Sequence, residues 1–134
     1  MSRKLLTFGY DACHRWAVLR FAGFTVHECG SIRELRQMLM TSTNVAAVIM
    51  VEDIVSVPQE AIIAARSYSD GPVILFEGRY PNESPTAFHL RVRNLTAPAE
   101  WLQGIQDVIQ NHHACAKAER SDRDLGNSDE VFLV

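Results

Sequence analysis

Four carboxylates each follow an apolar segment of the chain: Asp11, Glu52, Asp53 and Glu77. The segments that precede them are Lys4–Phe8, Val45–Val51 and Pro72–Phe76. If these segments are parallel strands of one sheet, the acids gather at the carboxyl ends of the strands, where α/β sheets place their sites. Carboxylate oxygens suit Mg²⁺, and crowded carboxylates favour a cation among them. The pattern therefore allows an acidic pocket with a divalent ion.

The elements around these acids alternate between strand and helix patterns. Short apolar or alternating segments predict five strands: Lys4–Phe8, Phe24–Cys29, Val45–Val51, Pro72–Phe76 and Phe88–Val92. Helical spacing predicts helices over about 12–22, 32–39 and 58–66, and a last helix from residue 98. Strands separated by helices imply parallel pairing with right-handed crossovers. We therefore predict an α/β fold, namely a flavodoxin-like (βα)5 doubly wound parallel five-stranded sheet.

Local patterns refine the ends of these helices. Asp11 can cap the first helix, and Gly23 can end it in a left-handed conformation. Ser31 and Glu34 have the spacing of a capping box. The segment Gly78–Thr86 contains two prolines and no helical stripe, so the fourth helix is expected to be short or missing.

Composition limits the domain organisation and the partners. The 134 residues carry a net charge of -3, which predicts one globular domain and gives no basic face for nucleic acid. No apolar run approaches the roughly 20 residues that span a bilayer, so no membrane partner is expected. Three widely spaced cysteines indicate free thiols in a reducing cytoplasm. We predict a domain over residues 1–114 and a tail over 115–134, either a helix extension or disordered.

The tail ends in four apolar residues, Val131–Val134, after a run of mixed charges. A run of this kind indicates a solvated helix end or disorder. The apolar end could be loose or could dock on its own domain. It could also add to the sheet edge of a partner.

The order of the predicted elements resembles that of a response-regulator receiver (CheY-like) domain over residues 3–112. The resemblance also rests on Ala22–Val26, on Pro72–Gly78 and on Leu95–Pro98. It implies a carboxylate pair after the first strand that holds Mg²⁺, and a phosphoacceptor Asp at the end of the third. It further implies a Thr or Ser at the end of the fourth strand and a Lys before a Pro after the fifth.

The chain departs from this pattern near the first and third strands. After the first strand only Asp11 is acidic, and its simplest role is the helix cap. Counted from the start of the third strand, the phosphoacceptor position falls on Met50 or the next residue; counted back from Pro58, it falls on Asp53 or the next residue. Met50 cannot accept a phosphoryl group. The simplest interpretation of Glu52 and Asp53 is that both are solvated acids in a loop.

The two later positions also lack the expected chemistry. Glu77 stands where a hydroxyl would donate to a phosphoryl oxygen, and a carboxylate there repels phosphate. Ala97 stands where the resemblance expects the lysine. The nearest cations include Arg91 and Arg93, which share one face of the predicted fifth strand.

These departures indicate a degenerate receiver, or pseudo-receiver, that is not an enzyme. We expect it to act in a bacterial cytoplasm by protein–protein interaction within two-component signal transduction or a phosphorelay. The resemblance implies a histidine kinase or an output protein as partner, or a second copy of the chain. Candidate interaction residues are Arg91, Arg93, Trp101 and the tail. Trp101 could equally be a core residue.

Two alternatives keep chemistry at the site. In the first, Asp53 is phosphorylated in an atypical but active response regulator with Mg²⁺. In the second, the chain is a small flavodoxin-like nucleotide-binding protein or enzyme. The second alternative needs donors for phosphate at the strand ends, where the sequence offers acids instead.

Overall fold

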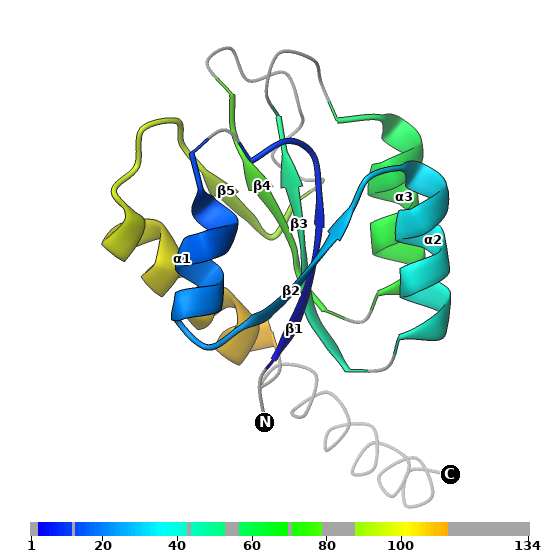
Figure 1. The fold of residues 1–134 in the computed structure, drawn as a ribbon, viewed down its shortest axis with the longest axis horizontal. Helices are drawn as coiled ribbons and strands as arrows, with labels where there is room; N and C mark the ends of the chain where they lie inside the picture. The colour runs from blue at the N-terminus through cyan, green and yellow to red at the C-terminus, as the bar shows by residue number, and fades with distance from the viewer. Residues whose placement is uncertain are drawn as a thin grey trace, which may run out of the picture.

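A computed structural model describes residues 3–11, 13–42, 44–52, 57–69, 71–78 and 88–112. Its centre is a five-stranded parallel sheet with the strand order β2-β1-β3-β4-β5 (Figure 1). The strands are β1 (Lys4–Phe8), β2 (Thr25–Cys29), β3 (Val45–Val51), β4 (Val73–Phe76) and β5 (Leu90–Val92). The helices are α1 (Arg15–Phe21), α2 (Ile32–Thr41), α3 (Gln59–Tyr68) and a C-terminal helix over 98–112.

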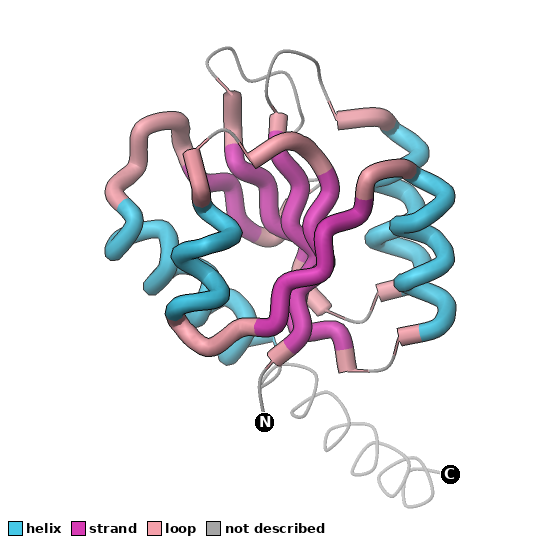
Figure 2. The backbone as a smooth tube through the Cα atoms, viewed as in Figure 1, coloured by secondary structure: helices cyan, strands magenta, loops and turns pink. Residues whose placement is uncertain are grey.

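This architecture confirms the predicted doubly wound α/β fold, whose strand order is the flavodoxin-like one. Helices α2 and α3 cover one face of the sheet, and α1 with the C-terminal helix covers the other (Figure 2). The expected short or missing fourth helix falls on 79–87, outside the described residues. The predicted tail, 115–134, also lies outside them.

The central strand β3 is apolar throughout because both of its faces are covered. Val48 and Met50 belong to the cluster under α2 and α3, whereas Ala47, Ile49 and Val51 belong to the cluster under α1 and the C-terminal helix. Alternate side chains of a strand point to opposite faces, so a strand buried twice must be apolar at each position. The sequence run Val45–Val51 predicts this arrangement, which the structure confirms.

Helix α1 begins three residues later than the sequence predicts. His14 adopts a left-handed conformation with φ of 55°, which keeps the chain from starting the helix at residue 12. Asp11 still caps the helix, since its Oδ1 accepts from the Arg15 N–H at 2.8 Å and its Oδ2 from the Trp16 N–H at 3.1 Å. Gly23, with φ of 101°, ends the helix as predicted.

The predicted capping box opens α2. Ser31 Oγ accepts from the Glu34 N–H at 3.1 Å, and Glu34 Oε2 accepts from the Gly30 N–H at 3.1 Å. The glutamate thus reaches one residue further back than in the standard box. Both bonds satisfy backbone donors at the start of the helix that packs beside α3.

The turn after β1 admits no side chain at residue 9. Gly9 has φ of 119°, and a Cβ placed there would lie 2.9 Å from the Cβ of Val51. Real Cβ atoms do not approach one another so closely, and L residues rarely adopt this φ. The close contact between the β1 turn and β3 therefore requires glycine.

A histidine fixes the opposite end of the sheet. His89 Nδ1 accepts from the Val73 N–H at 2.9 Å, and the His89 N–H donates to the Val73 carbonyl at 2.8 Å. The His89 ring packs edge-on against the ring of His112, with centroids 5.2 Å apart. Burial lowers the pKa of His89, and the nearby charges of His112 and Arg66 lower it further. The neutral ring therefore serves as a backbone acceptor at the start of β4.

No helix in the described part of the chain is long and apolar enough to cross a bilayer.

Candidate functional site

The carboxyl ends of the strands lie together at one edge of the sheet, at the top of Figure 1. The register aligns Phe8 with Met50, Met50 with Leu75, and Phe76 with Val92. Residues that follow these strands consequently meet at this edge. Glu52 and Glu77 are both placed there, whereas Asp53 lies outside the described residues.

Glu77 is held by an arginine of the neighbouring strand. Its Oε1 lies 2.8 Å from Arg91 Nε, and the side chains of Glu77 and Arg91 are only 14% and 17% exposed. The Nε–H does not point along the line to that oxygen, so the contact is a close ion pair and not a straight hydrogen bond. The parallel ladder extends into Glu77, whose N–H donates to the Val92 carbonyl at 2.8 Å. The carboxylate is thus fixed and its charge is balanced inside the protein.

The two predicted surface arginines differ in environment. Arg93 is exposed, as an outward strand face predicts. Arg91 lies beside Leu75 in the ladder and turns its guanidinium to Glu77, the first residue after β4. Arg91 is therefore part of the site and offers little free surface to a partner.

The structure corrects the interpretation of Glu52 as a solvated acid in a loop. Its side chain is only 2% exposed. The Glu52 N–H donates to the Phe76 carbonyl at 2.9 Å, and its Oε1 accepts from the Gly78 N–H at 3.4 Å. These bonds hold the end of β3 against the end of β4. A carboxylate with so little access to water requires polar partners, and the turn after β4 supplies one.

Asp11 has a structural role. Both of its carboxylate oxygens accept backbone N–H groups at the start of α1. The residues nearer to β1 are Gly9 and Tyr10, which carry no carboxylate. Asp11 is therefore a helix cap, as its simplest interpretation predicts.

Two positions at which the receiver pattern expects a polar side chain carry apolar residues in this chain. Met50 is fully buried in the cluster under α2 and α3. Ala97 is exposed just before the C-terminal helix, and its carbonyl accepts from the N–H groups of Glu100 and Trp101. Neither side chain can bind or accept a phosphoryl group.

Aromatic rings fill the other face of the same edge. Phe76 packs edge-on against Trp16, with centroids 6.1 Å apart, and against Trp101, with centroids 5.2 Å apart. The guanidinium carbon of Arg15 lies 4.4 Å from the Phe76 ring centroid, which is a cation–π contact. Trp101 is buried, so it is a core residue and does not present a surface to a partner.

Sequence reasoning missed the role of Arg15 and the ion pair of Glu77. Arg15 lies four residues after the cap Asp11, which puts it in the first turn of α1, beside the strand ends. The spacing of Glu77 and Arg91 gives no hint of contact, because the register of β4 against β5 is not written in either segment. The available signal for this ion pair was an acid, Glu77, after one predicted strand and an arginine, Arg91, within the next predicted strand.

The described carboxylates at this edge contact protein groups. Asp11 is engaged with the backbone, and Glu77 is engaged with Arg91. Within the described ranges, no group of three or more His, Cys, Asp or Glu side chains is placed to hold a metal ion. Of the four acids that the sequence predicts at one edge, the three described ones, Asp11, Glu52 and Glu77, contact protein groups.

No family model matches the sequence, and no curated protein matches it. The fold is similar to that of solved structures. An adenylate cyclase from Rhodopirellula baltica has a TM-score of 0.70 at 15% identity, covering 92% of this chain and 98% of that one. A response regulator receiver protein from Sinorhizobium medicae WSM419 has a TM-score of 0.64 at 17% identity, covering 83% and 97%.

A CheY-like receiver domain protein from Methanospirillum hungatei JF-1 has a TM-score of 0.65 at 13% identity, covering 85% of this chain and 98% of that one. At such identities the likeness concerns the fold alone. The fold is that of receiver domains, as the resemblance in sequence implies.

Proposed function

We propose that the chain is a receiver-like signalling domain that acts by binding another protein and has lost phosphorylation chemistry. The observation that carries this proposal is the ion pair between Glu77 and Arg91, with Nε and Oε1 2.8 Å apart. It puts a carboxylate, already neutralised by a fixed arginine, at the strand end where a receiver would offer a hydroxyl.

Phosphoryl transfer needs cations and donors around the equatorial oxygens of the phosphoryl group. At the described edge, Glu77 would repel those oxygens, and Ala97 offers no charge. The guanidinium of Arg91 is held by an acid, and that of Arg15 packs on Phe76. The contacts of these side chains therefore favour a role in stabilising the edge of the sheet over a role in binding an anion.

The same balance of charge disfavours a nucleotide site or an enzyme acting on phosphates. Such sites use backbone N–H groups or cations that face the phosphate. The two acids at the edge, Glu52 and Glu77, instead consume the available donors, Gly78 N–H and Arg91. We therefore propose a non-enzymatic role.

The proposed partner is a protein of a two-component pathway, either a histidine kinase or an output protein, or a second copy of the chain. The exposed loop between β5 and the C-terminal helix is the candidate surface. It presents Arg93 and the 92% exposed side chain of Leu95, which has a left-handed backbone with φ of 67°. An exposed leucine beside an arginine suits a partner with an apolar and acidic patch.

The loss of phosphorylation is tested by incubating the chain with acetyl phosphate and Mg²⁺ and measuring the intact mass. The mass is expected to stay unchanged. The matched control is Asp53→Asn under the same conditions. A gain of one phosphoryl group that disappears in Asp53→Asn would overturn the proposal and establish Asp53 as a phosphoacceptor.

A further inference from the structure

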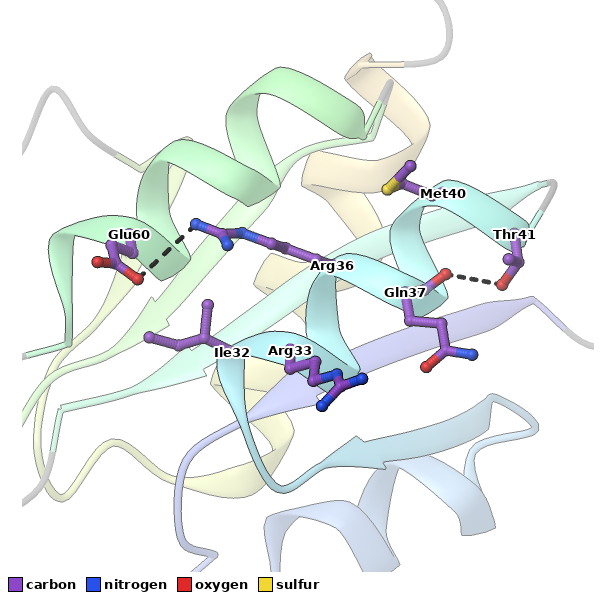
Figure 3. A pocket seen from close by; sticks show the side chains of 7 residues that line it. All are labelled: Ile32, Arg33, Arg36, Gln37, Met40, Thr41 and Glu60. Atoms are coloured by element: carbon purple, nitrogen blue, oxygen red, sulfur yellow. Dashed lines mark hydrogen bonds and ion pairs between the residues drawn. The ribbon is translucent and has the colours of Figure 1, made fainter.

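An open pocket lies over helix α2, next to α3, on the side of the molecule that the proposed function does not use. Its volume is about 600 Å³. Figure 3 shows the lining residues Ile32, Arg36 and Met40 on α2, with Arg36 reaching across to Glu60 of α3. Six of the seven lining residues belong to α2 and Glu60 belongs to α3, so the pocket lies over α2 at its border with α3.

The pocket combines an exposed apolar side chain with two arginines, Arg33 and Arg36. The apolar part is Met40, which lines the pocket near the end of α2 and is 69% exposed. Arg36 pairs with Glu60 at 3.7 Å, but both side chains are at least half exposed, so the pair contributes little. Arg33 lines the pocket one turn before Gln37, and the structure gives it no ion pair within the described residues. A ligand with acids followed by apolar residues would match both features.

The chain itself contains such a segment. Residues Asp129 and Glu130 directly precede the four apolar residues Val131–Val134. Along α2 the arginines Arg33 and Arg36 come first and the apolar Met40 follows. Acids followed by apolar residues would therefore match this order. We propose that residues 129–134 bind in the α2/α3 pocket of the same molecule, with the acids at the arginines and Phe132 against Met40.

The connecting chain is long enough for this contact. The described part ends at residue 112, so sixteen residues, 113–128, separate it from the segment. Sixteen residues can span at most roughly 55 Å. A domain of about 110 residues has a radius of gyration of about 13 Å, so either face of the sheet is within range.

Attachment to the domain also favours the intramolecular contact. A tethered segment has an effective concentration in the millimolar range, so modest affinity keeps it bound. The bound segment would cover Met40 and occupy the pocket until a competing ligand with the same order of charge and apolar groups displaced it. This inference does not depend on the proposed function, because it concerns a different surface.

The test uses the full chain with ¹³C-methyl methionine and nuclear magnetic resonance. The Met40 methyl is assigned from Met40→Leu, and the buried Met50 methyl serves as the internal reference. Phe132→Ala is expected to shift the Met40 resonance, because the ring current of Phe132 is lost, and to leave Met50 unchanged. Leu125→Ala, a substitution upstream of the segment, is the matched control and is expected to leave both resonances unchanged.

Charge reversal tests the polar half of the contact. Arg33→Glu is expected to produce the same Met40 shift as Phe132→Ala, and Glu130→Arg added to Arg33→Glu is expected to restore it. An unchanged Met40 resonance in Phe132→Ala would overturn the proposal. So would a Met40 position that depends on protein concentration, because the segment would then come from a second copy.

Discussion

Removal of the Glu77 carboxylate tests whether the edge of the sheet is held together by charge. Arg91 Nε lies 2.8 Å from Glu77 Oε1, and both side chains are more than four-fifths buried. At an effective dielectric constant of about 20, two unit charges at that separation attract by about 6 kcal/mol. Desolvation of the two groups cancels part of this attraction. We expect Glu77→Ala to lower the free energy of unfolding by about 3 kcal/mol, because the Arg91 charge stays in a poorly solvated place.

A double-mutant cycle separates the pair from other effects of each substitution. Arg91→Ala is expected to cost about 3 kcal/mol as well, and the double variant is expected to cost about 2 kcal/mol less than the sum. The assay is urea unfolding followed by tryptophan fluorescence, since Trp16 and Trp101 both pack against Phe76. If the two substitutions add within about 0.5 kcal/mol, the ion pair does not stabilise the edge.

The control cycle uses a pair on the surface. Arg20 and Glu28 form an ion pair at 3.1 Å, with about half of each side chain exposed. Alanine at either position is expected to cost less than about 1 kcal/mol, because water screens the charges. A control cycle as large as that of Glu77 and Arg91 would show that burial is not the reason for the coupling.

Two further predictions concern His89 and Gly9. Because burial lowers the pKa of His89, the unfolded chain binds the proton more readily, and the free energy of unfolding is expected to fall as the pH drops below about 6.5. His89→Gln should flatten this part of the urea-midpoint profile between pH 7 and 5, and an unchanged profile would contradict the assignment. Gly9→Ala is expected to cost about 3 kcal/mol, because both the positive φ and the 2.9 Å contact with Val51 oppose it. Gly23→Ala has a similar φ but nothing within 4 Å, so it should cost about 1 kcal/mol; equal losses in thermal unfolding would show that the contact is unimportant.

The sheet could be predicted because its strands are apolar runs with clear turns between them. The run Val45–Val51 has no polar interruption, and a strand covered on both faces requires this. The start of α1 could not be predicted as well. The left-handed conformation of His14 delays the helix, and helical periodicity carries no information about one such residue.

The site was harder to predict because its contacts depend on how strands are aligned. Glu52 follows a strand and has the composition of a loop residue, yet the end of β4 covers it. Glu77 and Arg91 meet only when Leu75 is aligned with Arg91 in the ladder. Neither segment encodes that alignment by itself, whereas the cap at Asp11 is local and was predicted correctly.

The turn after β1 also limits where a carboxylate could stand at this edge of the sheet. The resemblance places acids directly after the first strand, and in this chain Gly9 is the first residue there. An aspartate at position 9 would bring its Cβ within 2.9 Å of the Val51 Cβ. A carboxylate at position 9 would therefore require a different turn or a smaller residue in place of Val51. The turn thus acts as a steric filter at the first position after β1, because it excludes every side chain there whatever its charge.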